Sequence, residues 1–166
     1  MIPPETCVLA TESPTQVHPE DPATGLPGRS AVEEFAARNI SLGREFVVAV
    51  FVVDRLRHIN GRFGSDTGDE VLLNMAQHLG ERLESGTLFR WSGSAFAVVL
   101  DSAQPFSTIE QQMKNLASLR LEKTVEKEGR VVIVAVTCSV MVQKVSEGDS
   151  RNAVFETLDD FVSTRG

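Results

Sequence analysis

The spacing of hydrophobic positions changes along the chain, from the period typical of helices to the pattern typical of strands and back. Apolar residues recur at helical spacing from Ser30 to about Asn39, and the run from Glu45 to Asp54 has the composition of a buried strand. From Thr67 onward, the spacing predicts the longest amphipathic helix of the chain, with one apolar face formed by Leu72, Met75, Ala76, Leu79 and Leu83.

The second half of the chain continues the alternation. Two short apolar runs, Leu88 to Trp91 and Phe96 to Leu100, flank Gly93 and predict a β-hairpin with its tip at that glycine. The spacing of apolar residues from Ser107 to Leu121 predicts a further helix, and the mixed charges from Glu122 to Arg130 predict a solvated turn.

The last segments are a β-branched run, Val131 to Val142, and a helical pattern from Val154 to Val162. Helices that alternate with strands, two of which form a hairpin, predict an α/β sandwich in which helices cover a mixed sheet. The first 20 residues are rich in proline and lack apolar periodicity, so we expect a linker or tail there and one domain over residues 21–166.

Charge and composition narrow the function. The net charge of -7 disfavours binding of long nucleic acids, because the chain repels a polyphosphate backbone. The longest apolar run, Phe46 to Val53, is far shorter than the roughly 18 to 20 residues that span a bilayer. No lysine or arginine precedes Arg29, and Cys7 and Cys138 suggest no disulfide framework, so we expect a cytoplasmic protein without membrane insertion.

Four segments follow one another in the order and spacing of a known family, and the last of them, Val136-Thr-Cys-Ser-Val140, is similar to the last long strand of that family. Asp21-Pro-Ala-Thr-Gly-Leu-Pro-Gly-Arg29 is similar to D-x-L-T-G-L-P-N-R, and Arg90-Trp-Ser-Gly-Ser-Ala-Phe96 is similar to R-Y-G-G-D-E-F. Between them, residues 52–69 are similar to D-x-D-x-F-K-x-I-N-D-x-Y-G-H-x-x-G-D, with these residues in register: Ile59, Asn60, Phe63, Gly64, Gly68 and Asp69. The chain thus resembles the GGDEF (diguanylate cyclase) domains over about residues 21–163.

The resemblance implies a nucleotidyl-cyclase-like, palm-like α/β sandwich around a mixed, mostly antiparallel sheet of about five strands. Family members join two GTP molecules held by the two subunits of a homodimer, with divalent cations bound by carboxylates. Such phosphoryl transfer depends on the neutralisation of charge and on positioning.

Every carboxylate that the resemblance assigns to the cations is missing. Val52 stands at the first metal position, and the motif of the hairpin reads Ser92, Gly93, Ser94, Ala95 and Phe96, with Ser94 and Ala95 in place of the acidic pair. Asp54 lies two residues, roughly 6.6 to 7 Å, beyond Val52 along the strand, so we do not expect it to replace the ligand. We therefore expect no cyclase activity, no bound Mg²⁺ and no required cofactor.

Part of the guanine site is retained. By resemblance, Asn60 and Asp69 contact the guanine edge and Arg57, at the lysine position of the family, contacts a phosphate. Asp69 and Asn60 also have structural explanations, as a helix-dipole partner and a turn residue. The product-inhibition motif R-x-x-D of the family falls on Leu83-Glu-Ser-Gly86, so we expect no inhibitory cyclic di-GMP site there.

Three functions remain open at this point. The first is a regulatory domain of cyclic di-GMP signalling that binds GTP or GDP without turnover and acts on an attached or separate partner, such as a phosphodiesterase domain of the EAL type. The second is an interaction or dimerisation module without nucleotide, and the third and most remote is an active cyclase. The sequence is compatible with a complete chain and with an excised domain.

Overall fold

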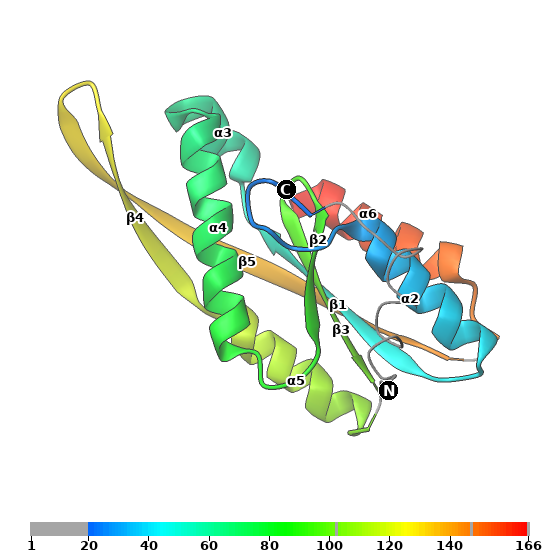
Figure 1. Cartoon of the computed structure of the whole chain (residues 1–166). Coiled ribbons are helices and arrows are strands. Elements are labelled where there is room, and N and C mark those ends of the chain that lie inside the picture. Colours follow the sequence, from blue (N-terminus) through cyan, green and yellow to red (C-terminus); the bar gives the residue numbers. More distant parts are fainter. Residues whose placement is uncertain (1–19, 102, 147, 166) are drawn as a thin grey trace, which may run out of the picture.

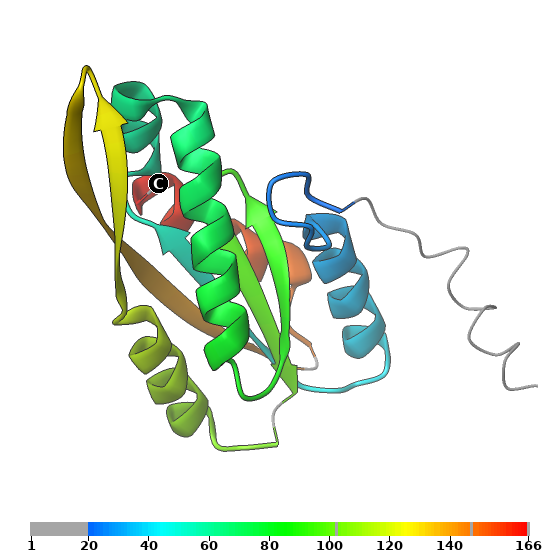
Figure 2. The same ribbon diagram turned by 60° about the vertical axis from the view of Figure 1, so that its left-hand side comes forward.

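The computed structural model describes residues 20–101, 103–146 and 148–165, which form a five-stranded sheet with helices on both faces (Figure 1, Figure 2). The sheet order is β2-β3-β1-β5-β4, and each pair of neighbouring strands is antiparallel. The α/β sandwich is thus confirmed, but without a parallel pair among the described strands. None of the described helices has the length and apolar composition needed to cross a bilayer.

The elements are α2 (Arg29–Ser41), β1 (Phe46–Val53), α3 (Leu56–Phe63), α4 (Ser65–Arg82), β2 (Thr87–Ser92), β3 (Ala95–Asp101), α5 (Phe106–Ala117), β4 (Arg120–Lys127), β5 (Arg130–Val145) and α6 (Arg151–Arg165).

Strand β1 is the centre of the core. It pairs with β3 on one edge and with β5 on the other, and all of its eight residues are buried. Alternate side chains point to opposite faces, so Val47 and Phe51 pack with residues of α3, α4 and α5, whereas Val48 and Val52 pack with residues of α2 and α6. An uninterrupted apolar sequence is what a strand covered on both faces requires.

The prediction of a solvated turn over Glu122 to Arg130 is wrong. Most of this stretch belongs to β4, which pairs with β5 along its whole length, and the turn is confined to the residues before Arg130. Burial alternates along β4, because Leu121 and Val125 are half-buried against the core while Glu122 and Glu126 face solvent. The period-two pattern is not apparent in the sequence, because charged residues occupy most positions of the strand and resemble those of a solvated turn.

The predicted start of the long helix at Thr67 needs a small correction. Helix α4 begins at Ser65, directly after Gly64, which ends α3 and has a φ of 97°. Such a positive φ favours glycine and lets the chain turn from one helix into the next without a linker. The hydroxyl of Thr67 donates to the carbonyl of Phe63 at 3.2 Å, so this residue lies inside the helix and does not cap it.

The segment before α2 is fixed to the hairpin of β2 and β3. The carboxylate of Asp21 accepts hydrogen bonds from the backbone and hydroxyl of Thr24, and the same oxygen lies 2.7 Å from a guanidinium nitrogen of Arg90. The backbone N–H of Arg90 donates to Pro27 at 2.9 Å. The expected linker of residues 1–20 lies outside the described residues, except for Glu20, which forms an isolated bridge with Pro27.

We predict that Arg90→Ala lowers the free energy of unfolding by about 2 kcal/mol, because the nearly buried carboxylate of Asp21 loses its charged partner. Chemical denaturation measures this change. The control is Arg38→Ala, which removes an exposed arginine from α2 and should change stability by about 0.5 kcal/mol or less. Equal effects of the two substitutions would contradict a specific role for Arg90.

We also predict that Val52→Asp costs about 3 kcal/mol or more, because it places a carboxylate at a fully buried position of β1. The loss should grow between pH 5 and pH 8, since the ionised form is the one that the core cannot solvate. Val52→Ala leaves a larger cavity than Val52→Asp but adds no charge, so its loss should be independent of pH and smaller than that of Val52→Asp at pH 8. A Val52→Asp chain as stable as Val52→Ala at pH 8 would refute this account.

Candidate functional site

The positions to which the resemblance assigns metal-binding carboxylates come together at one end of β1. Val52 is the cross-strand partner of Ala95, and the N–H of Val53 donates to the carbonyl of Ser94 at 2.8 Å. Both Val52 and Ala95 are completely buried within the core on the α2 and α6 side of the sheet. These positions are therefore neighbours, but their side chains are apolar or, at Ser94, a single hydroxyl.

The carboxylate of Asp54 is engaged elsewhere. One oxygen accepts from the hydroxyl of Thr137 at 2.9 Å, and the other accepts from the hydroxyl of Ser139 at 2.8 Å. Both partners lie on β5, where the backbone N–H of Asp54 also donates to Thr137. Burial and, secondarily, the nearby charge of Asp54 raise the pKa of the Cys138 thiol to about 12. Asp54 thus ties the end of β1 to β5.

These side chains do not fit a magnesium ion. Mg²⁺ prefers hard oxygen ligands, usually carboxylates, and Val52, Ser94 and Ala95 together offer one neutral hydroxyl. Within the described ranges, no group of three or more His, Cys, Asp or Glu side chains is close enough to hold a metal ion.

The tip of the β2–β3 hairpin keeps its shape through an arginine whose role the motif alone does not reveal. The guanidinium of Arg90 donates to the carbonyls of Ser92 and Gly93 at 2.7 and 2.8 Å, and it lies 5.6 Å from the ring of the buried Phe96. One side chain therefore holds both the tip and the preceding Asp21 turn. In the sequence, this role is indicated only by the position of Arg90 at the start of the segment that resembles R-Y-G-G-D-E-F, three residues before Gly93.

The role of a second arginine was missed in the same way. Arg29 lies 4.3 Å above the ring of Trp91 and forms two hydrogen bonds with Asp159, at 2.6 and 2.9 Å. The same carboxylate accepts from the indole N–H of Trp91 at 3.1 Å. The hydrogen bond with Asp159 is the main reason that the pKa of Arg29 lies above its ordinary value. This contact joins α2, β2 and α6.

The three residues predicted to contact a guanine nucleotide lie at the junction of α3 and α4. Arg57 and Asn60 are one turn apart on α3, and Arg57 and Asp69 are exposed. The side-chain oxygen of Asn60 is buried and lacks a hydrogen-bond partner among the described residues. It lies against Gly68 of α4, where a methyl group in place of the glycine hydrogen would come within 1.6 Å of it. Gly68 therefore leaves the space that Asn60 occupies, and Asp69 follows directly.

The last helix brings one basic residue to the neighbouring turn. Helix α6 has no lysine or arginine between Arg151 and its final residue, Arg165. The carbonyl of Arg165 accepts from the N–H of Arg55 at 3.3 Å, so the end of α6 lies beside the turn between β1 and α3. The guanidinium of Arg165 itself lies 5.5 Å from the ring of Phe161.

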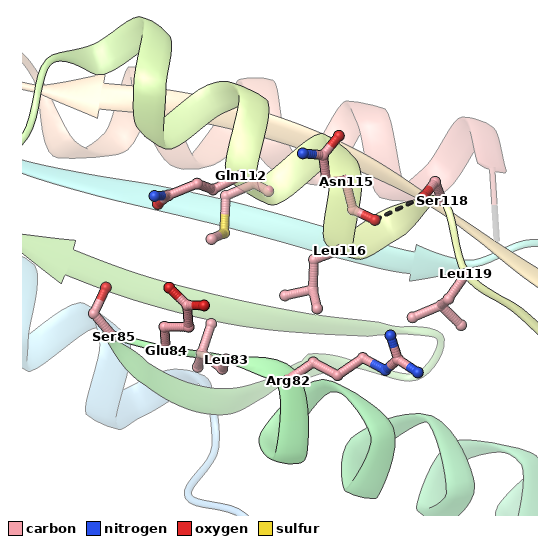
Figure 3. A pocket seen from close by; sticks show the side chains of 10 residues that line it. Arg82, Leu83, Glu84, Ser85, Gln112, Asn115, Leu116, Ser118 and Leu119 are labelled. Carbon is pink, nitrogen blue, oxygen red and sulfur yellow. Dashed lines mark hydrogen bonds between the residues drawn. The ribbon is translucent and has the colours of Figure 1, made fainter.

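The residues that replace the product-inhibition motif line a surface cavity of about 320 Å³ (Figure 3). The stretch from Arg82 to Ser85 forms one side, and Gln112, Asn115 and Leu116 of α5 lie on the other. The lining contains Arg82 and Glu84 but not the arginine and aspartate of the family motif. The absence of an inhibitory cyclic di-GMP site here stays a prediction.

Comparison with known proteins identifies the family. The model of the family described as "Diguanylate cyclase, GGDEF domain" matches residues 19–164. Over 145 residues, 84% of this chain, the sequence is 31% identical to diguanylate cyclase DgcP of Pseudomonas aeruginosa and 26% identical to diguanylate cyclase DgcM of Escherichia coli K12. The match spans only 21% of the first relative and 34% of the second.

Solved structures share the fold. The diguanylate cyclase SiaD of Pseudomonas aeruginosa, in complex with its activator SiaC, superposes with a TM-score of 0.71 at 23% identity, covering 96% of this chain and 61% of that one. The GGDEF domain of FimX from the same organism superposes with a TM-score of 0.69 at 20% identity, covering 90% and 97%. The motifs, the sheet and these matches agree, and the chain belongs to the diguanylate cyclase GGDEF domain family.

Proposed function

We propose that this GGDEF domain binds a guanine nucleotide without converting it and acts as a regulatory domain in cyclic di-GMP signalling. The observation that carries the proposal is the contrast between two parts of the same site. The buried pair of Val52 and Ala95 occupies the metal end, whereas Asn60 keeps an unpaired carbonyl beside Gly68 and Asp69.

Electrostatics disfavour turnover. Attack of a hydroxyl on a phosphate builds negative charge that cations neutralise, and a site without carboxylates cannot hold those cations in place. Asp54 is a poor substitute, because it lies two residues beyond Val52 along the chain and its two oxygens are oriented toward hydroxyls of β5. The resulting loss amounts to several kcal/mol of transition-state stabilisation.

Base recognition would use the α3–α4 junction. The exposed carboxylate of Asp69 is suited to accept from the ring N–H and amino group of guanine. The oxygen of Asn60 is directed toward Gly68, which leaves its amide N–H₂ to donate to the base. Arg57, exposed on α3, supplies a charge for a phosphate.

Such a domain transmits a signal through the protein that carries or contacts it. The relative SiaD was crystallised with an activator protein, and the GGDEF domain of DgcB from Caulobacter crescentus was crystallised with cyclic di-GMP. By analogy, we propose that nucleotide binding here changes the contact with an attached or separate partner, such as an EAL-type domain.

Calorimetric titration tests the proposal directly. GTP and GDP should bind the wild-type protein with similar affinity with and without Mg²⁺, and Asn60→Ala should weaken binding about tenfold, the equivalent of roughly 1.4 kcal/mol. ATP is the control ligand, because its base offers no matching donors to Asp69. Undetectable binding at millimolar GTP would favour the interaction module, and cyclic di-GMP formed by the purified protein would establish an active cyclase.

The contact between Asn60 and Gly68 gives a matched pair of substitutions. Gly80→Ala, in the same helix and with open space around it, should stabilise the protein by about 0.5–1 kcal/mol. Gly68→Ala should not be stabilised in this way, and it should weaken GTP binding about tenfold, because the new methyl group displaces the side chain of Asn60. Thermal unfolding and calorimetry measure the two effects. Unchanged GTP affinity in Gly68→Ala would show that Asn60 does not contact the base.

A further inference from the structure

Strand β5 is longer than the sheet around it. It pairs with β1 from Cys138 to Val145 and with β4 from Arg130 to Thr137. In the described part of the chain, residues 130–136 therefore have a strand partner on one edge only, and the last backbone hydrogen bond on the other edge joins Asp54 to Thr137. Figure 1 shows the β4–β5 hairpin projecting beyond α3. A free edge offers a row of backbone donors and acceptors to another strand.

The side chains of this edge do not protect it. From Val131 to Val136 every residue is apolar, and no proline or charge interrupts the run. Val131 and Ile133 are 68% and 65% exposed, on a face of the hairpin that none of the described helices covers. Val132 and Val134 lie on the opposite face and pack against the core. Natural proteins usually place lysine, proline or a bulge on such an edge to prevent pairing.

The groove beside the edge is basic. A cavity of about 330 Å³ separates β5 from α3, and Arg55, Arg62 and Arg120 contribute to its lining. Asp54 is the acidic residue of the lining, and its oxygens are engaged by β5 hydroxyls. Arg120 also lies 4.0 Å from Glu122, but both side chains are well exposed, so this pair neutralises little. This concentration of positive charge stands out in a chain with a net charge of -7.

We propose that residues 130–136 bind an extended, acidic, β-branched segment of a partner protein as an added strand. Main-chain hydrogen bonds supply affinity, Val131 and Ile133 contact apolar side chains of the segment, and carboxylates face Arg55 and Arg62. At about 3.4 Å per residue the edge extends for roughly 24 Å, enough for a segment of about seven residues. This surface is separate from the nucleotide proposal and does not depend on it.

A second copy of this chain is a poorer occupant. Edge-to-edge pairing of two β5 strands would bring the arginines of both grooves together, and like charges across an interface oppose association. The charge of the groove therefore selects a segment of opposite sign.

Selection from a displayed library of random seven-residue peptides, with the whole chain as bait, tests the proposal. We expect the selected peptides to be rich in glutamate, aspartate, valine and isoleucine and to lack proline at their centre. Two N-methylated forms of a selected peptide should then be compared, one methylated at its odd-numbered and the other at its even-numbered backbone nitrogens. Only one form should lose binding, because an added strand uses the N–H groups of every second residue to pair with the edge. Peptides that are basic, or that bind equally in both methylated forms, would overturn the proposal, as would a selection that enriches nothing.

Substitutions locate the site. Fluorescence anisotropy with the selected peptide should show at least tenfold weaker binding to Ile133→Asp and to Arg62→Glu. Thr124→Asp is the matched control for the first, since Thr124 is the cross-strand partner of Ile133 on β4, and Arg38→Glu on α2 is the control for the second; each should change affinity less than twofold. Full affinity for both Ile133→Asp and Arg62→Glu would refute the site. A dimer in sedimentation that Ile133→Asp dissociates would assign the edge to self-association instead.

Discussion

The burial of β1 on both faces is the constraint on which the rest of this structure depends. All of its side chains are enclosed, and it is the only described strand that joins the β2–β3 hairpin to the β4–β5 hairpin. The resemblance to the family assigns a metal-binding carboxylate to position 52, near the end of this strand. With valine at position 52 and alanine opposite it at position 95, the apolar packing continues to the end of the strand. The same two side chains therefore complete the core on this side of the sheet.

Two arginines of the family motifs, Arg29 and Arg90, have structural roles. Arg90 holds the hairpin tip and the Asp21 turn, and Arg29 connects α2 to α6 through Asp159 and the ring of Trp91. These contacts preserve the shape around positions 52, 94 and 95 whether or not catalysis takes place there. No such structural contact is found for the side-chain carbonyl of Asn60, which is buried without a hydrogen-bond partner in the described structure. It occupies this position because Gly68, which has no side chain, leaves space for it.

The two ends of the sheet are unequal. Where β1 pairs with β5, helices cover both faces, and beyond Asp54 the β4–β5 hairpin continues with α3 and α4 on one face only. Lys123 pairs with Glu70 at 3.0 Å and Lys127 contacts the carbonyl of Arg62, so the covered face is anchored by charged residues as well as by apolar ones. Within the described ranges, no other segment pairs with the edge of β5 from residue 130 to residue 136.

The sequence alone determined the features that depend on residue type and local period. These include the alternation of helices and strands, the hairpin tip at Gly93 and the absence of carboxylate side chains at positions 52, 94 and 95. Tertiary structure decided the features that depend on which distant segments meet. Strand β4 was hidden because its solvent-facing charges resemble those of a turn, and it is recognisable only through its pairing with β5. The engagement of Asp54 by Thr137 and Ser139, the fit of Asn60 against Gly68 and the unpaired edge of β5 likewise follow from strand order and helix packing, which act between residues that no local pattern connects.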